Sequence, residues 1–232
     1  MRFRNPFSRQ RAPALRNETH EMILLSLARA EENALDSFPH DLARELDLAR
    51  PALDSHVGAL VAAGLVRNAS GGMLALSPSG RHRAHALLRR HRLAERLFTD
   101  VLGMDWAHAH TEADKLEHLV SLEATAALAH RLGDPETCPH GNPIPGAGKS
   151  STHSLARPLA ECAPVTRAII ARIGLETPAA LQHLATLGLL PDVEIQVENK
   201  VPMGGPVMVR VGRAHYALGR DLASRIWVTP QT

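Results

Sequence analysis

Pro39 and Pro51 each begin a short amphipathic segment, and this pair constrains the fold of the N-terminal third more than any other feature. Proline is favoured in the first turn of a helix, because the N–H that it lacks has no partner there. We therefore predict helices over residues 39–47 and 51–64, with a final glycine as the cap of the second. An earlier apolar periodicity predicts a helix over residues 18–30. Two short helices joined by a tight turn form a helix-turn-helix.

A predicted β-hairpin follows this motif. Residues 65–68 and 73–77 are strand-like, and Gly71-Gly72 supplies the turn between them. A hairpin in this position is the wing of a winged helix-turn-helix, which places the start of its second motif helix in the major groove of DNA. The positions expected to contact DNA are Arg50, Pro51, Ala52, Ser55 and His56, with Arg50 as the strongest polar contact. Asp54 is left out, because its carboxylate stabilises the helix N-terminus.

Potential metal ligands recur at helical spacing between His91 and His118. Residues three and four apart share one face of a helix, so His91 lies beside Glu95. By the same spacing, a second face carries His110, Asp114, Glu117 and His118. Imidazoles mixed with carboxylates bind divalent metals such as manganese, iron, cobalt or nickel. Either group alone is equally explained as the solvated face of an amphipathic helix, but two groups so close together favour a metal-sensing protein.

Composition indicates a globular protein that stays in the cytoplasm. The chain has 232 residues, 44% of them hydrophobic, and no apolar run approaches the roughly 20 residues that span a bilayer. Its start has no hydrophobic signal segment. Cys138 and Cys162 are too few for a disulfide framework and are interpreted as structural thiols. The first sixteen residues hold arginines and no acid, which suits either a flexible arm near phosphates or a plain disordered tail.

The second half of the chain divides into helix, linker and a small β domain. A face rich in alanine and leucine predicts a helical stretch from about residue 108 to 132. Gly-, Pro- and Ser-rich sequence follows and predicts a linker over residues 147–160. Short strand-like segments in residues 161–232, with a helix over 177–192, favour a small SH3-like barrel.

Four segments carry a resemblance to a known family: LSPSGR, RHRLAERLFTDVLGMD, HTEADKLEH and CPHGNPIPG. Their order resembles the diphtheria toxin repressor family of metal-dependent transcriptional regulators, closely over residues 18–146 and more loosely beyond. The fold class implied is a mainly α N-terminal part, made of a winged helix-turn-helix and a helical dimerisation domain, with a small C-terminal SH3-like β-barrel. The domains expected are a basic arm at 1–17, a DNA-binding domain at 18–82, a metal-binding and dimerisation domain at 83–146, the linker, and an SH3-like domain at 161–232.

The resemblance also implies two metal sites per subunit. The ancillary site would use His91, Glu95 and His110, and the primary site would use Met22, Asp114, Glu117 and His118. Iron-responsive members have a cysteine where this chain has Asp114, and the best known manganese member has an aspartate where it has Met22. Glu21 is an alternative to Met22, which could instead be core packing. The C-terminal segment resembles a ferrous-transport A type domain and would add Glu176 to the ancillary site, whereas Gln182 stands too late to match a further ligand.

The function predicted from these residues is that of a metal-activated repressor and not of an enzyme. A carboxylate at Asp114 hardens the site, so Mn²⁺ is favoured and Fe²⁺ is the alternative. One ion held by Met22 and the residues near Glu117 would tie the DNA-binding domain to the next domain. A homodimer would then read a palindromic operator, with metal-transport genes as natural targets. The alternatives are a winged-helix regulator indifferent to metal, and a metallohydrolase, for which no nucleophile or phosphate-binding motif is present.

Overall fold

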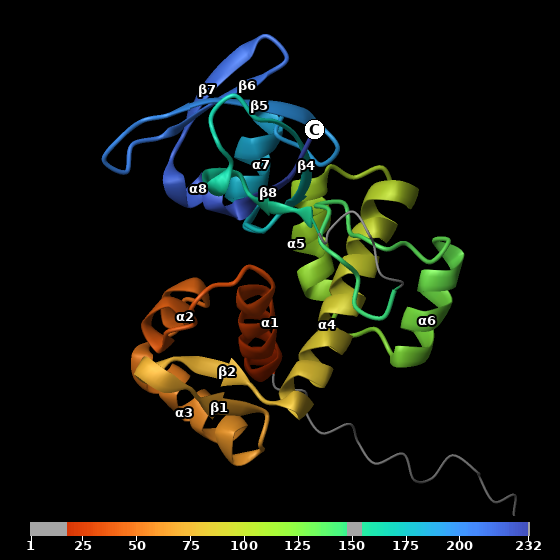
Figure 1. Ribbon diagram of the computed structural model, residues 1–232. Helices are drawn as coiled ribbons and strands as arrows, with labels where there is room; N and C mark the ends of the chain where they lie inside the picture. Colours follow the sequence, from red (N-terminus) through yellow and green to blue (C-terminus); the bar gives the residue numbers. More distant parts are fainter. Residues whose placement is uncertain (1–17, 148–154, 232) are drawn as a thin grey trace, which may run out of the picture. The chain divides into compact units, whose positions relative to one another are not determined.

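The computed structural model describes residues 18–147 and 155–231 and divides them into two compact units (Figure 1). The first unit holds residues 18–30 and 36–84, and the second holds residues 31–35 and 85–231. The basic arm expected at 1–17 and the middle of the expected linker lie outside the described residues. Within the described ranges, no helix is both long and apolar enough to cross a bilayer.

The first unit is the predicted winged helix-turn-helix. Its elements are α1 (Glu18–Glu32, which continues into the second unit), α2 (Pro39–Glu45), α3 (Arg50–Ala62), β1 (Val66–Asn68) and β2 (Leu74–Leu76). Proline occupies the first turn of both α2 and α3, as the sequence predicts. The strands β1 and β2 pair antiparallel, with Gly71 and Gly72 at positive φ in the turn between them. Leucines of α1, α3 and β2 are fully or almost fully buried and make up the core.

Helix α4 (Pro78–Arg96) begins in the first unit and continues through the second. Its first turn is fixed by Ser77, whose hydroxyl accepts a hydrogen bond from the backbone N–H of Gly80 at 3.0 Å. A Cβ at Gly80 would lie 1.9 Å from the carbonyl oxygen of Leu65, so only glycine fits where the helix leaves the hairpin. The helix ends in η2 (Leu97–Val101), a turn of π-helix.

The helical stretch predicted from about residue 108 to 132 is wrong in one respect, because the structure breaks it into two helices. These are α5 (Trp106–Leu116) and α6 (Leu122–Arg131). Ser121 causes the break: its hydroxyl accepts from the backbone N–H of Ala124 at 3.1 Å, and its own backbone is extended. A residue that caps a helix in this way cannot belong to a preceding one.

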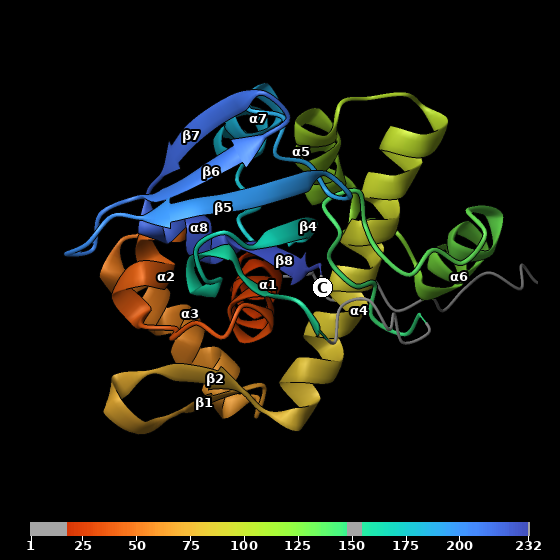
Figure 2. The ribbon, with the colours of Figure 1, turned by 45° about the horizontal axis from the view of Figure 1, so that its top comes forward.

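A six-stranded antiparallel sheet forms the C-terminal SH3-like domain, and the predicted fold class is confirmed. Its strands are β3 (Arg157–Pro158), β4 (Arg167–Ile173), β5 (Glu194–Lys200), β6 (Val207–Val211), β7 (Ala214–Leu218) and β8 (Ile226–Pro230), in the order β3-β8-β4-β5-β6-β7. Figure 2 shows β5, β6 and β7 side by side in this order. The other elements are η4 (Leu159–Glu161), α7 (Pro178–Thr186) and α8 (Arg220–Arg225). Leu159 is fully buried in this core, so the domain begins inside the segment 147–160 predicted as linker.

Candidate metal centre

Helix α4 places His91 and Glu95 one turn apart on a wholly buried face. The Nε2 atom of His91 lies 2.9 Å from Oε1 of Glu95. Leu87, Leu88 and Leu93 are also fully buried on this helix, so the polar pair lies in the protein interior. A charge in such a setting is unfavourable unless it is paired or bound to a metal.

Helix α5 adds His110 to this pair. Its Nδ1 atom lies 2.7 Å from Oε1 of Glu95 and 3.1 Å from Nε2 of His91. Asp105 fixes the start of α5 by accepting hydrogen bonds from the backbone N–H groups of Ala107 and His108. The structure thus brings His91, Glu95 and His110, three of the four ancillary ligands that the resemblance implies, to within hydrogen-bond distance of one another.

His140 completes this group and was missed by the sequence analysis. It lies in the loop between α6 and β3, is fully buried, and places Nδ1 3.2 Å from Oε1 of Glu95. The loop is held against β4 because the backbone N–H of Ile173 donates to the carbonyl of His140 at 2.9 Å. Gly141 permits this approach: at φ 82° its missing Cβ would lie 2.2 Å from the carbonyl oxygen of Ala171.

The charges in this cluster are strongly coupled. Burial disfavours the charged form of Glu95, but His140 and His91 outweigh burial and hold the pKa of Glu95 well below its ordinary value. Burial likewise disfavours protonated His140, yet Glu95 and Cys138 raise the pKa of His140 well above its ordinary value. Without a metal, the centre therefore keeps a carboxylate and an imidazolium together in the interior.

Cys138 and Glu176 also lie beside His140. The Sγ atom of Cys138 is 3.6 Å from Nδ1 of His140, and burial raises the pKa of the Cys138 thiol. Cys138, His140 and Glu176 each offer a ligand atom within 4.8 Å of the others. Glu176, expected as an ancillary ligand, stands between β4 and α7 in the SH3-like domain. The spacing Cys-x-His within CPHGNPIPG was the available signal for the two missed residues.

Three of the residues expected at the primary site continue the cluster at the end of α5. Oδ1 of Asp114 lies 3.3 Å from Nδ1 of His91, and Oε2 of Glu117 lies 2.6 Å from the same atom. Asp114 also forms a candidate metal group with His91 and His110. Nε2 of His118 is 3.5 Å from Oε1 of Glu117. His91 therefore contacts residues from both expected sites.

Met22, the fourth residue expected at the primary site, is half-buried on α1 in the first unit. Its alternative, Glu21, is almost fully buried, and Arg83 places Nη2 3.6 Å from Glu21 Oε1. A ligand from α1 stays a prediction.

The residues expected to contact DNA lie at the start of α3. Arg50, Pro51, Ala52 and Ser55 are exposed. Arg50 Nε donates to Asp54 Oδ1 at 2.8 Å, so a DNA phosphate or base would compete with this carboxylate. The ring of His56 instead contacts that of His20 edge-on, with centroids 5.2 Å apart, which makes His56 less available than its neighbours.

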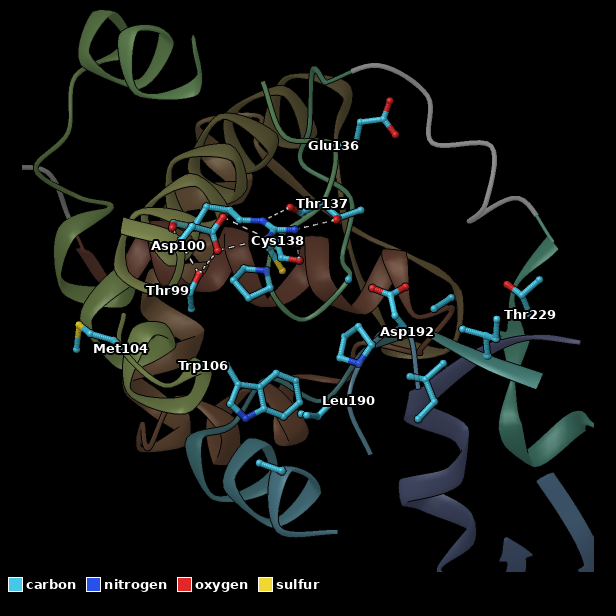
Figure 3. Close-up of a pocket in the computed structure, with 18 of the residues that line it drawn as sticks. Thr99, Asp100, Met104, Trp106, Glu136, Thr137, Cys138, Leu190, Asp192 and Thr229 are labelled. Carbon is cyan, nitrogen blue, oxygen red and sulfur yellow. Dashed lines mark hydrogen bonds and ion pairs between the residues drawn. The ribbon is translucent and has the colours of Figure 1, made fainter. Parts of the chain in front are cut away.

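A cavity of about 860 Å³ borders the cluster within the second unit (Figure 3). Cys138 lies in its wall, together with Arg96, Asp100, Trp106 and Asp192. Arg96 is held in place by the carbonyl of Thr137, to which its Nε donates at 2.7 Å. The Cys138 end of the cluster is therefore adjacent to open volume.

The residues of the cluster fit a divalent cation. Oε2 of Glu95 is buried and has no hydrogen-bond partner among the described residues. An unsatisfied buried carboxylate oxygen is unfavourable by about 1–3 kcal/mol or more, and a cation would satisfy it. Imidazoles, carboxylates and one thiol together suit manganese, iron or another first-row divalent ion.

Comparison with known proteins assigns the chain to a family. Residues 77–146 match the family of iron dependent repressor, metal binding and dimerisation domains, and residues 157–230 match the FeoA domain. The iron-dependent repressor IdeR of Mycobacterium tuberculosis is 31% identical over 227 residues, which cover 91% of this chain and 96% of IdeR. The chain belongs to the diphtheria toxin repressor family. The repressor of Corynebacterium diphtheriae itself is 39% identical over 129 residues, covering 56% of this chain and 57% of that protein.

Solved structures of this family have the same fold. A manganese-dependent transcriptional repressor in complex with manganese is 30% identical, with a TM-score of 0.80, and the match covers 91% of this chain and all 100% of that one. The IdeR of T. acidophilum is 27% identical, with a TM-score of 0.78 over 95% of this chain and 100% of its own. The family resemblance predicted from the four sequence segments is confirmed, and these relatives are transcriptional repressors.

Proposed function

We propose that this protein is a homodimeric repressor that binds palindromic operator DNA when a divalent cation, Mn²⁺ or alternatively Fe²⁺, occupies the centre around His91. The observation that carries the proposal is the convergence of His91, Glu95, His110 and His140 in the interior, where Glu95 retains an unpaired buried oxygen. Structural needs alone do not explain so many buried ionisable groups, because packed apolar residues would be at least as stable.

Two ions per subunit would be held by two adjacent sets of residues. His91, Asp114, Glu117 and His118 would form one site, which Met22 or Glu21 would complete from α1. Glu95, His110 and His140 would form the other, with Cys138 and Glu176 beside His140. The ion supplies positive charge that holds these elements together, and it can favour the DNA-binding state only if that state offers it more ligands.

The nature of the ligands supports manganese over iron. Asp114 provides a hard oxygen where iron-responsive relatives carry a thiolate. The thiol of Cys138 favours softer ions, but its raised pKa keeps it protonated and therefore a weak ligand until a metal displaces the proton. Genes for transport of the same ion are the targets we propose.

A mobility-shift titration on palindromic promoter DNA tests the function. The native protein is titrated with Mn²⁺, Fe²⁺, Zn²⁺ or chelator, in parallel with Asp114→Ala. Glu112→Ala is the matched control, since Glu112 lies on the same helix and, among the described residues, forms an ion pair only with Lys115. We expect Mn²⁺ to tighten DNA binding of the native protein and of Glu112→Ala, and to do so far less for Asp114→Ala.

Two results would contradict parts of this proposal. Full metal-dependent binding by Asp114→Ala would remove Asp114 from the site. Operator binding that no metal or chelator changes would support a winged-helix regulator indifferent to metal.

A further inference from the structure

The last turn of α1 belongs to the second unit, although its earlier turns belong to the first. Glu32 in this turn forms a salt bridge with Arg92 of α4, at 2.8 and 2.5 Å between paired nitrogens and oxygens. Arg92 is almost wholly buried and also donates to the carbonyl of Pro143 at 2.5 Å. The end of α1 is therefore fixed to the metal-binding part of the chain.

A second arginine, Arg172 of the SH3-like domain, holds the same turn. Its Nη2 donates to the backbone carbonyl of Glu32 at 3.0 Å, and its Nη1 donates to Oδ1 of Asn33 at 2.8 Å. The last carbonyls of a helix have no partner within the helix and carry partial negative charge. Arg172 thus caps α1 with a cation that comes from strand β4.

The interaction is built into the barrel. Arg172 is only 6% exposed, and its guanidinium lies 4.0 Å from the ring centroid of Trp227. Burial lowers the pKa of Arg172 to about 10, which leaves it charged at neutral pH. Asn33 in turn donates to the carbonyl of Gly174 at 3.3 Å, and a Cβ at Gly174 would lie 2.1 Å from Oδ1 of Asn33. Glycine at position 174, just after β4, therefore leaves the space that the side chain of Asn33 occupies.

One residue connects this cap to the metal centre. Asn142 is 1% exposed, and its Nδ2 donates to Oε1 of Glu176 at 2.5 Å. Its Oδ1 accepts from Nη1 of Arg172 at 3.3 Å. A continuous path of hydrogen bonds therefore runs from the candidate ligand Glu176 through Asn142 and Arg172 to the end of α1.

We propose that Arg172 is a positioning residue that couples occupation of the metal centre at Glu176 to the helix that begins the DNA-binding unit. The inference rests on the proposed function, because it assigns a route by which the metal affects DNA binding. When Glu176 is drawn into metal ligation, Asn142 and Arg172 are held, and with them the last turn of α1. Without metal, Glu176 and Asn142 are freer to move and the cap weakens.

The test compares Arg172→Met with Arg167→Met, a control on the same strand whose side chain is exposed. Amide hydrogen exchange of residues 31–35 is measured in chelator and in saturating Mn²⁺, and Mn²⁺ binding and operator binding are titrated separately. In the native protein and in Arg167→Met, we expect Mn²⁺ to slow exchange in this turn by about tenfold, a typical size for coupling between sites. In Arg172→Met, we expect Mn²⁺ to slow exchange in this turn by less than about threefold. Operator affinity should be about tenfold lower than in the native protein, whereas Mn²⁺ affinity should change by less than about threefold.

Two further variants guard against a folding defect in Arg172→Met. Asn33→Ala removes the acceptor from the α1 side, and Gly174→Ala displaces Asn33 sterically while retaining Arg172. Each should reproduce the loss of Mn²⁺-dependent protection with a thermal unfolding midpoint for the barrel close to that of the native protein. Unchanged protection and unchanged operator affinity in all folded variants would overturn the inference. Failure of the proposed function would give a different result, because operator binding by the native protein itself would then respond to no metal.

Discussion

Charged side chains of the metal centre are buried and contact one another, whereas those at the start of α3 are exposed and make few contacts. Glu95 has His91, His110 and His140 within 3.2 Å of one oxygen. The side chain of Arg50, by contrast, forms an ion pair only with Asp54 among the described residues. The buried cluster has side chains fixed in positions that suit a metal ion, whereas the exposed side chains at the start of α3 can change conformation to fit different DNA sequences. The structure therefore says far more about the effector than about the operator sequence.

Glu95→Ala should produce the largest effect, because it removes the carboxylate around which the histidines gather. In chelator, we expect the free energy of unfolding to fall by about 3–5 kcal/mol, as when one partner of a buried charge pair is lost. Denaturant unfolding measures this, with Glu112→Ala as the control. A loss below about 0.5 kcal/mol, the size of an ordinary surface substitution, would show that the cluster is not tightly packed around Glu95.

His140→Ala tests the candidate ligand that the sequence analysis missed. We expect Mn²⁺ affinity to fall by about a hundredfold, since outer-shell residues alone change metal affinity by about 10–100-fold. Calorimetric titration of the metal measures it. His108→Ala, an exposed histidine on α5, should bind Mn²⁺ like the native protein. Equal affinities for both variants would place His140 outside the site.

The stability of the metal-free protein should depend on pH through His140. Because the folded state raises the pKa of His140, it retains a proton that the unfolded chain loses near pH 6.5. The free energy of unfolding should therefore fall as pH rises above about 6.5, by at most about 1.4 kcal/mol per unit for one group.

Unfolding at a series of pH values measures this slope, and His140→Gln should flatten it. Stabilisation by Mn²⁺ should instead increase over the same range, because the metal binds the neutral imidazole. A stability in chelator that rises with pH through this window would contradict the assigned charge on His140.

Arg50→Ala should have the smallest effect. Arg50 is exposed and its guanidinium also pairs with Asp54. We therefore expect the free energy of operator binding to weaken by about 1 kcal/mol, the lower end of the range for a base contact. Asp54→Ala should strengthen DNA binding slightly by releasing Arg50. Mobility shift at fixed salt measures both, and a large loss from Asp54→Ala would show that this carboxylate reads DNA directly.

Local signals account for what the sequence predicted well. Pro39, Pro51 and the Gly71-Gly72 turn act within a few residues, and the winged helix follows from them. The candidate ligands spaced by three and four on α4 and α5 were predicted for the same reason. The break at Ser121 was missed because apolar periodicity continues across it, while a capping hydroxyl leaves little trace in such a pattern.

His140 and Cys138 could not be found by helical spacing, because they lie in a loop. They lie near Glu95 because their loop packs against β4. This packing requires glycine at position 141, since a Cβ there would lie 2.2 Å from the carbonyl oxygen of Ala171, and the sequence alone does not reveal this contact. Glu176 was predicted only through the family resemblance, and its neighbour Asn142 had no predicted role. Contacts between distant segments of the chain were therefore the part that sequence reasoning left open.

Glu176 and Arg172 stand within one short stretch at the end of β4, on either side of Gly174. A shortened protein that stopped before Arg157 would retain the helices α1 to α6, yet it would lose both the candidate ligand Glu176 and the arginine that caps α1. If the proposed coupling through Arg172 holds, we expect deletion of the SH3-like domain to weaken the response to metal even where the remaining chain folds.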